Sequence, residues 1–475
     1  MSVAGHATAG LVSTMGRATT STAVISAAAA VGGKATAAAA AAAESGGGAN
    51  KFQVQTFNAI SPDGLKKFPP ASFMLTGSSG AVPEGVAPEP HAILLRSHKL
   101  QPEEVGTAVR AIARCGAGTN NVPIDEMTKR GIPVFNTPGA NANSVKELAL
   151  CGLLLAARGV HEGITHVKET IVPNSKDNTE VNQKIEKDKK LFAGTELMGK
   201  TLAVLGLGNI GAMVAESALA LGMNVIGYDP KISVDAAWRL PNSVKKMPSI
   251  MDTMAAADYV SINMPYIKGV THHIISDEVL SVMKPTCSIV NFARGEIVDG
   301  AALLKRFEAG HKGKYVSDFG DGAVQKHKNF ICIPHLGAST EEAEDNCAKM
   351  AADQVVHFLE TGTIKNSVNF PSASLDRQDA DHTRLCIINQ NRPGVLGEMT
   401  TLLGSMNLNI AQQLNTSLGD IAYNVIDLQD FPEGPEAQAV QERILALEGV
   451  LSTRIIWTGS AQEGPQNFLT KGCVS

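Results

Sequence analysis

The sequence lacks several features that would place it in other classes of protein. Its 475 residues contain no Cys-x-x-Cys pair, and the seven cysteines are scattered, at positions 115, 151, 287, 332, 347, 386 and 473. This spacing predicts reduced thiols rather than a disulfide framework or a zinc site, so we expect no metal. The sequence has no stretch of eighteen apolar residues without a charged residue among them, which argues against a transmembrane helix.

Aromatic residues are sparse, at 4% of the chain, and the formal net charge is −5. Few stacking surfaces and no excess of positive charge argue against nucleic acid and anionic membranes as partners. The hydrophobic fraction of 44% is ordinary for a globular protein. The chain is long enough for roughly two to four domains.

The segment 1–50 has no acidic residue before Glu44 and is rich in Ala, Ser, Thr and Gly. Its basic residues are Arg17 and Lys34. This composition resembles an organellar transit peptide, and the low arginine content favours the plastid stroma over the mitochondrion. The alternative is a low-complexity tail without an address, as in a cytoplasmic enzyme. In either case we expect the segment to lie outside the fold.

From residue 51 short apolar runs alternate with amphipathic stretches. The predicted strands include 92–97, 132–137, 259–265 and 287–294. The predicted helices include 102–114, 144–160 and 340–362, with a charged loop or solvated helix at 173–190. Thr340 is a candidate cap for the last helix, with acids in its first turn. The alternation predicts an α/β fold built on a doubly wound parallel sheet.

The end of the chain has a different pattern, after a polar linker at 371–382. Strands are predicted at 384–390, 408–417, 421–428 and 450–458, with helices after "NRPG" and at 435–447. This βαββαβ order is that of a ferredoxin-like unit.

One glycine motif points to a dinucleotide. "LGLGNIG" contains Gly206, Gly208 and Gly211, follows the apolar run "TLAVL" and opens a predicted helix. In a Rossmann unit the three glycines allow a tight turn, close approach of the pyrophosphate, and close packing of helix on strand. Asp229 ends the next predicted strand, where its carboxylate binds ribose hydroxyls and repels a 2′-phosphate. The motif therefore predicts NAD rather than NADP as cofactor.

Two further residues are candidates for catalysis. Arg294 in "VNFARGE" closes a predicted strand, at the edge of the sheet where ligands bind in doubly wound folds. Its guanidinium can grip a carboxylate and polarise a carbonyl. His335 in "IPHLGAST" also follows an apolar run, and histidine is suited to proton transfer near neutral pH.

These motifs, with "GAGTNNVPIDEMTKRGIPVFNTPGANANSVKEL", "MKPTCSIVNFARGEIVDGAALL" and "PHLGAST", resemble the D-isomer-specific 2-hydroxyacid dehydrogenases over residues 90–370. The segment beginning "INQNRPGVLGEM" resembles an ACT domain, a small module that binds amino acids. The resemblance implies a flavodoxin-like substrate domain that is split around the NAD-binding domain, with helices near 144–160 and 340–362 as hinges. The implied boundaries are 51–150 and 330–370 for the substrate domain, 151–329 for the NAD-binding domain, 383–460 for the ACT domain and 461–475 for a tail.

The resemblance also implies roles for the site residues. Arg294 would bind the substrate carboxylate and keto oxygen, and His335 would take the proton from the C2 hydroxyl. The implied contacts to NAD are Gly206, Gly208, Asn209, Ile210, Gly211, Asp229, Met264, Phe292, Ala293, Arg294, Asp318, His335 and Gly337. The glutamate that normally supports the histidine is not matched, because Gly322 and Ala323 stand there. Asp321 is either its catalytic substitute or a turn residue in "GDG".

For the substrate, the resemblance implies a basic group in each of two stretches, here Arg96 and Arg114, with Ser97, Ala117 and Gly118 beside them. Asn141 and Lys146 are further candidates. Two arginines favour a phosphorylated substrate, 3-phosphoglycerate, over glyoxylate or hydroxypyruvate. In the ACT unit Asn391 and Asn409 match effector positions, so serine is a candidate effector, and a purely structural, dimerising unit is the alternative. A homo-oligomer is expected. A catalytically silent NAD-sensing scaffold is the rival outside enzymes.

Overall fold

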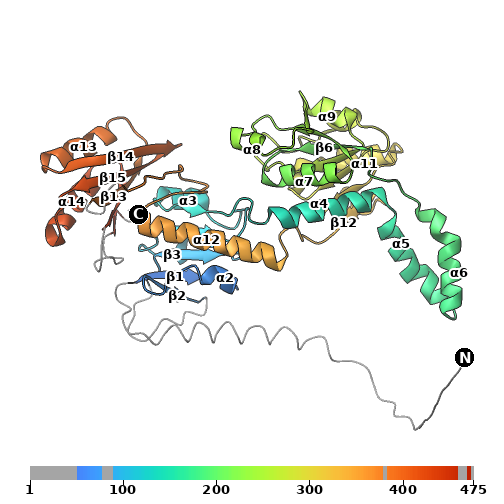
Figure 1. Ribbon diagram of the computed structural model, residues 1–475, viewed down its shortest axis with the longest axis horizontal. Coiled ribbons are helices and arrows are strands. Elements are labelled where there is room, and N and C mark those ends of the chain that lie inside the picture. The colour runs from blue at the N-terminus through green and yellow to red at the C-terminus, as the bar shows by residue number, and fades with distance from the viewer. Residues whose placement is uncertain (1–50, 78–88, 378–381, 458–467, 472–475) are drawn as a thin grey trace, which may run out of the picture. The chain divides into compact units, whose positions relative to one another are not determined.

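The computed structural model describes residues 51–77, 89–377, 382–457 and 468–471 (Figure 1). The expected transit peptide, 1–50, lies outside the described residues. The described chain forms three sheets, two of them parallel and one antiparallel. The doubly wound α/β class predicted from the sequence is therefore confirmed for the two parallel sheets.

The first sheet has five parallel strands in the order β2-β1-β3-β4-β5. This order is the flavodoxin-like one. The strands are β1 (Phe52–Thr56), β2 (Phe73–Thr76), β3 (Ala92–Leu95), β4 (Ala111–Arg114) and β5 (Val134–Phe135). Helices α2 (Pro62–Leu65), α3 (Ile124–Lys129) and α12 (Glu341–Thr361) belong to this domain, with a 3-10 turn η2 at Pro102–Glu104. The core of the sheet contains residues of α12, so the domain is assembled from two distant parts of the chain.

The helix predicted over 102–114 is wrong. The structure has η2 at its beginning and the buried strand β4 at its end. The run "AIAR" packs between β3 and β5, with its first three residues fully buried. Short apolar runs have no distinguishing periodicity when both faces of a strand are buried, so the pattern alone did not separate strand from helix.

The second sheet has seven parallel strands in the order β12-β11-β10-β9-β6-β7-β8. The strands are β6 (Thr201–Leu205), β7 (Asn224–Tyr228), β8 (Lys245–Lys246), β9 (Tyr259–Ile262), β10 (Ser288–Asn291), β11 (Tyr315–Ser317) and β12 (Phe330–Cys332). The helices are α4 (Ala142–Ala157), α7 (Asn209–Ala220), α8 (Val234–Trp238), α9 (Ile250–Ala256), α10 (Asp277–Ser281) and α11 (Gly300–Glu308). The strand order reverses between β6 and β9, which is where ligands bind in open α/β sheets.

Two apolar layers cover this sheet. One contains α4 and α7, and the other contains α9, α10 and α11. The strand β12 pairs with β11, so the domain boundary that the resemblance implied at residue 330 lies inside this sheet. The chain leaves the sheet after β12 and enters α12, whose cap is Thr340 as predicted: its side chain accepts a hydrogen bond from the backbone N–H of Ala343.

An arm of helices follows α4. Helix α5 (Val160–His166) is followed by a short π turn (Val167–Ile171) and a short 3-10 turn (Val172–Asn174). The chain then forms α6 (Asn178–Asp188), which ends in a second 3-10 turn (Lys189–Phe192). None of the residues of α6 is buried, so the charged segment predicted as a loop or solvated helix is a solvated helix.

The third sheet, with its helices, is called the C-terminal module below. It consists of β13 (Thr383–Gln390), α13 (Val395–Ser405), β14 (Asn409–Leu418), β15 (Ile421–Gln429), α14 (Gly434–Ala446), β16 (Val450–Ile456) and β17 (Phe468–Thr470). The antiparallel order is β14-β15-β13-β16-β17. The predicted βαββαβ order is confirmed, and β17 adds an edge strand within the segment expected to be a tail. One face of the sheet packs on α13 and α14, and the other packs on the end of α12.

Candidate active site

The glycine turn between β6 and α7 has the geometry that a dinucleotide needs. Gly206 has φ +88, and a Cβ there would lie 2.8 Å from the backbone nitrogen of Met264. A Cβ on Gly211 would clash with the carbonyl oxygen of Gly206, whereas Gly208 faces open space. The turn therefore leaves the amino end of α7 open for a pyrophosphate.

The carboxylate of Asp229 lies beside this turn, directly after β7. Its Oδ2 accepts a hydrogen bond from the backbone N–H of Leu207 at 2.9 Å, and its Oδ1 accepts one from Lys231 at 2.9 Å. Each oxygen keeps a second lone pair for a ribose hydroxyl. Together with the open turn, this arrangement fits NAD.

Arg294 lies where the two parallel-sheet domains meet, a region that is called the crevice below because ligands bind at this edge of doubly wound sheets. It follows β10 with an extended backbone, and its exposed side chain reaches across to the loop after β4. A Cβ on Gly118 would lie 2.8 Å from Nη2 of Arg294, so the end of the guanidinium lies directly against this glycine. The loop and the arginine are predicted to bind the same substrate, and the structure places them in contact distance.

Arg114 and Arg96 lie in the same neighbourhood. Nε of Arg114 donates to the backbone carbonyl of Arg96 at 3.1 Å. Burial lowers the pKa of Arg114, and the nearby charges of Arg294 and Arg96 act in the same direction. Three guanidinium groups therefore share one region of the crevice, where an anionic ligand would relieve their mutual repulsion.

Glu344, in the first turn of α12, forms an ion pair that the sequence did not predict. Its Oε1 lies 2.5 Å from Nη2 of Arg96, and the two side chains are about a third exposed, at 40% and 35%. From the sequence, acids in this turn were interpreted only as partners of the helix dipole. No local signal in the sequence indicates this contact, because 247 residues lie between Arg96 and Glu344.

His335 follows β12, and its side chain is exposed. Its ring meets the ring of Phe319 edge-on, with centroids 4.9 Å apart. Asp318, which follows β11, is buried, with 5% exposure. Burial raises the pKa of Asp318, while the charges of His335 and Arg294 and the backbone N–H of Gly337 oppose that shift. Asp318 is thus a buried carboxyl group in the electric field of both candidate catalytic residues.

Comparisons with known proteins agree with this geometry. The family model described as "D-isomer specific 2-hydroxyacid dehydrogenase, NAD binding domain" matches residues 153–337. The D-3-phosphoglycerate dehydrogenase of Escherichia coli K12 is 31% identical over 382 residues, which cover 77% of this chain and 87% of that protein. The chain belongs to the D-isomer-specific 2-hydroxyacid dehydrogenase family. The resemblance seen in the sequence is confirmed, and the chain is an NAD-dependent dehydrogenase.

A second relative and a solved structure extend the comparison. The D-3-phosphoglycerate dehydrogenase of Dictyostelium discoideum is 28% identical over 427 residues, which cover 86% of this chain and 98% of that protein. Among solved structures, an NAD+-bound 3-phosphoglycerate dehydrogenase of Entamoeba histolytica has a TM-score of 0.52 at 23% identity and covers 67% of this chain and 98% of that one. At this identity the structural match supports the fold alone.

Asp321 is not placed as a partner of His335 in this dehydrogenase. Its Oδ1 accepts a hydrogen bond from the backbone N–H of Ala323 at 2.9 Å, and its carboxylate packs against Gly300. This is the local bond by which aspartate stabilises a turn. Of the two alternatives left open by the sequence, the structure favours the turn. Asp318 is instead the carboxyl group on which the charge of His335 acts, without a hydrogen bond between the two side chains among the described residues.

Asp318→Asn and Asp321→Asn are expected to behave differently. Asp318→Asn should change the pH dependence of kcat and raise the KM for NAD, whereas Asp321→Asn should leave the pH–rate profile superimposable on that of the parent enzyme. Burial raises the pKa of Asp318, so its ionised form costs stability above the ordinary carboxyl pKa. Asp318→Asn should therefore have a Tm at neutral pH at least as high as the parent. A changed profile for Asp321→Asn alone would reverse this assignment.

Asp229→Ala tests the cofactor site. The variant loses the ribose acceptors and the repulsion of a 2′-phosphate. The KM for NAD should rise, and the ratio of kcat/KM for NADP to that for NAD should increase. Asp252→Ala is a matched control, because Asp252 lies in the first turn of α9 within the same domain and accepts a hydrogen bond from the hydroxyl of Ser249, the cap of that helix. If Asp229→Ala kept the parental ratio of kcat/KM for NADP to that for NAD, the placement of the ribose at Asp229 would be wrong.

The remaining predicted cofactor contacts lie around the same crevice or turn. Asn209 is the first residue of α7, its Oδ1 accepts from Nη1 of Arg239 at 3.1 Å, and its amide lies against Gly139. Phe292 is buried, and Gly337 is buried beside Asp318. The others, Ile210, Met264 and Ala293, are partly buried at the ends of the elements that surround the crevice. Their contact with NAD stays a prediction.

The minor substrate candidates lie after three strands of the first sheet and in the helix that follows: Ser97 after β3, Ala117 after β4, Asn141 after β5 and Lys146 in α4. The backbone N–H of Ser97 donates to Asn58, and the carbonyl of Ala117 accepts from Asn136 at 2.7 Å. Oδ1 of Asn141 is buried, with no hydrogen-bond partner within the described residues. Lys146 lies 3.6 Å from Glu147, so its charge is partly neutralised locally.

The two predicted effector residues do not meet within the chain. Nδ2 of Asn391 donates to the carbonyl of Gly419, at the β14–β15 hairpin, whereas Asn409 begins β14 and bonds to Gln429. The ten residues of β14 separate them, which is roughly 30 Å along a strand. A single small ligand within one module cannot touch both.

Proposed function

We propose that the chain oxidises 3-phospho-D-glycerate to 3-phosphohydroxypyruvate with NAD, the first step of the phosphorylated route to serine. The observation that carries this proposal is the convergence of Arg96, Arg114 and Arg294 in one crevice. The substrate has a carboxylate and a phosphate, and a phosphate carries about −1.5 to −2 charge at neutral pH. The names of the relatives in Escherichia coli and Dictyostelium support the same substrate.

The residues of the crevice divide the chemistry between them. Arg294 holds the substrate carboxylate with its planar fork and polarises the oxygen on C2. His335 accepts the proton of the C2 hydroxyl as the C2–H bond breaks and the C2=O bond forms. NAD, which the turn of Gly206, Gly208 and Gly211 and the carboxylate of Asp229 would hold, would supply the acceptor for the hydride that leaves C2 with its electron pair. The buried carboxylate of Asp318 stabilises the positive charge that His335 gains when it takes the proton.

Two alternatives fit the observations less well. A glyoxylate or hydroxypyruvate reductase would bind a substrate without the phosphate that Arg96 and Arg114 are proposed to hold. A silent NAD-sensing scaffold would not need Arg294, His335 and Asp318 in one electrostatic cluster. Steady-state NADH formation with 3-phosphoglycerate, D-glycerate and glycolate distinguishes them. We expect the highest kcat/KM with 3-phosphoglycerate. A higher value with an unphosphorylated acid would contradict the proposal.

We further propose that the C-terminal module is an ACT domain that binds serine and that the chain is a homo-oligomer in the plastid stroma. The βαββαβ order supports the first part. Because Asn391 and Asn409 lie at opposite ends of β14, a ligand that contacts both must lie between the modules of two copies. Sedimentation of the purified protein with and without L-serine tests this. A monomer, or a mass and an activity unaffected by serine, would contradict it.

A further inference from the structure

Helix α12 has charges that suit its dipole at one end only. Glu341, Glu342 and Glu344 lie in its first turn, and its last turn has no basic residue. The last carbonyl groups of a helix carry partial negative charge and need donors. In this chain the C-terminal module supplies them.

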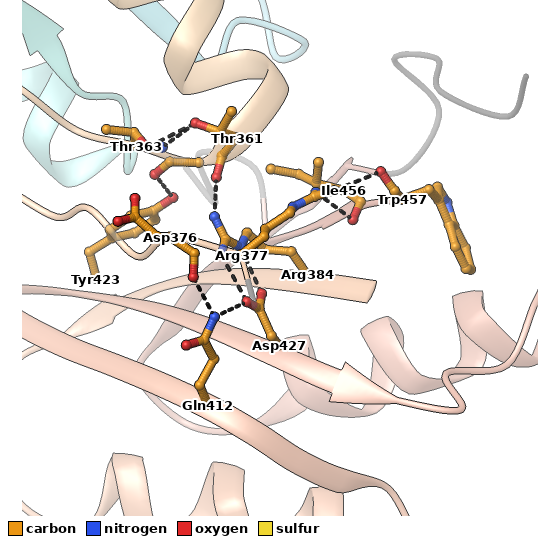
Figure 2. A network of polar contacts seen from close by, with 11 residues as sticks. Thr361, Thr363, Asp376, Arg377, Arg384, Gln412, Tyr423, Asp427, Ile456 and Trp457 are labelled. Carbon is orange, nitrogen blue, oxygen red and sulfur yellow. Dashed lines mark hydrogen bonds and ion pairs between the residues drawn. The ribbon is translucent and has the colours of Figure 1, made fainter. Parts of the chain in front are cut away.

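Two side chains of the module bind the carbonyls that end α12 (Figure 2). Nη1 of Arg384 donates to the carbonyl of Thr361 at 2.9 Å. The hydroxyl of Tyr423 donates to the carbonyl of Gly362 at 2.7 Å. Gly362 is the left-handed cap of the helix, with φ +77, and a Cβ there would lie 2.6 Å from Sγ of Cys386. The cap therefore fits only a glycine closely packed on β13.

Arg454, on β16, binds the preceding turn. Its Nη2 donates to the carbonyl of Phe358 at 2.7 Å, its Nη1 lies 3.4 Å from the carbonyl of Leu359, and its guanidinium lies 4.4 Å from the centroid of the Phe358 ring. Two cations from another domain thus occupy the negative end of α12. We call Arg384, Tyr423 and Arg454 the helix clamp.

The clamp is held rigidly inside the module. Nε and Nη2 of Arg384 form a two-point ion pair with Asp427 at 2.7 and 2.8 Å, and the side chains are 2% and 1% exposed. Gln412 bonds both to Asp427 and to the carbonyl of Asp376 in the linker (Figure 2). Burial by itself would raise the pKa of Asp427, but the hydrogen bonds from Arg384 and Gln412 outweigh it and lower the pKa.

The other end of the same helix reaches the anion site. Glu344 is paired with Arg96 at 2.5 Å. Cys347, about one turn further on, is a buried thiol, and the nearby charge of Arg114 partly opposes the rise in its pKa that burial causes. Between Glu344 and Thr361 the helix spans about 26 Å. Its buried residues from Cys347 to Leu359 share one apolar core with the first sheet, and a close-packed core transmits displacements.

We propose that the C-terminal module is a positioning element of the substrate site. Its helix clamp fixes the carboxyl end of α12, and α12 in turn holds Glu344 against Arg96. The proposal rests on the proposed function only where it treats this site as the one for 3-phosphoglycerate. A ligand that distorts the module would reach the arginines through this one helix.

The test uses three clamp variants of the full-length enzyme. Tyr423→Phe removes a single hydroxyl, and Arg454→Met removes the second cation. Arg384→Met combined with Asp427→Leu removes both charges of a buried pair, a change that proteins often tolerate without loss of stability. Arg392→Gln is the matched control, because Arg392 is paired with Glu448 on the exposed surface of the same module. Each clamp variant is made both in the parent enzyme and in the Glu344→Gln variant, which keeps the shape of the side chain but removes its charge.

In the clamp variants we expect the KM for 3-phosphoglycerate to rise by about threefold to thirtyfold, the range for coupling through a packed network. The KM for NAD and kcat should stay unchanged, and Arg392→Gln should resemble the parent. In the Glu344→Gln background the clamp variants should no longer change the KM. Hydrogen exchange should become faster at both ends of α12.

Either of two results would overturn the proposal. One is a clamp variant with the parental Tm and the parental KM. The other is faster exchange confined to 355–362, with the first turn of α12 unaffected, which would make the clamp a cap without influence on the site. Because exchange is measured without substrate, it decides the matter even if the parent enzyme does not oxidise 3-phosphoglycerate. Tyr423→Phe keeps the test valid if the larger changes prevent folding.

Discussion

Replacing His335 with alanine is expected to lower kcat by about a hundredfold or more, the usual contribution of a general base. The imidazole lies on the crevice side of β12, with Phe319 against its ring and the buried Asp318 in its field. Alanine leaves the C2 hydroxyl without an acceptor for its proton, while the fold loses only an exposed side chain. Single-turnover NADH formation measures the chemical step separately from product release.

A matched control is His327→Ala. His327 stacks on Phe307 of α11, with centroids 4.7 Å apart, and belongs to the packing of the same domain. We expect its kcat to resemble that of the parent. If His335→Ala turned over at a near-parental rate in single-turnover experiments, the proton would have to leave by another route.

Arg294→Lys is expected to lower kcat/KM by about a hundredfold to a thousandfold, comparable to the removal of one donor from an oxyanion hole. Lysine keeps the positive charge but loses the planar fork that grips a carboxylate at two points. The shorter reach also matters, because Nη2 of Arg294 lies against Gly118 on the opposite domain. Full progress curves with 3-phosphoglycerate give kcat/KM directly.

The control for this substitution is Arg306→Lys, a conservative exchange on α11 in the same domain. Its kcat/KM should stay close to the parental value. A loss of only a few fold in Arg294→Lys would show that charge alone is sufficient at this position. The two-point grip assigned to the guanidinium would then be wrong.

The parts of the fold that depend on local chemistry could be predicted from the sequence. The glycine spacing of "LGLGNIG" demanded a tight turn before α7, and Thr340 with the acids that follow it marked the start of α12. The βαββαβ order followed from alternating apolar runs and turn residues. Each of these signals acts within a few residues, where backbone conformation and capping decide the outcome.

What could not be predicted depends on pairs that are distant in the chain. The sequence around Arg96 does not indicate that its partner is Glu344. The cations that cap α12 likewise come from distant strands, β13 and β16. The choice between Asp318 and Asp321 depended on which carboxyl group is buried beside His335. Residue spacing does not show this, because both positions follow the same strand.

Transfer of deuterium from 3-phospho-D-[2-²H]glycerate tests the central claim most directly. The reaction assigned to Arg294 and His335 moves the C2 hydrogen with its electron pair, so the NADH formed must carry one deuterium and form more slowly than from unlabelled substrate. D-[2-²H]glycerate, which lacks the phosphate that Arg96 and Arg114 are expected to bind, should react at a much lower kcat/KM. Mass spectrometry of the NADH gives the answer. Unlabelled NADH from the phosphorylated substrate, or equal kcat/KM for the two acids, would contradict the account.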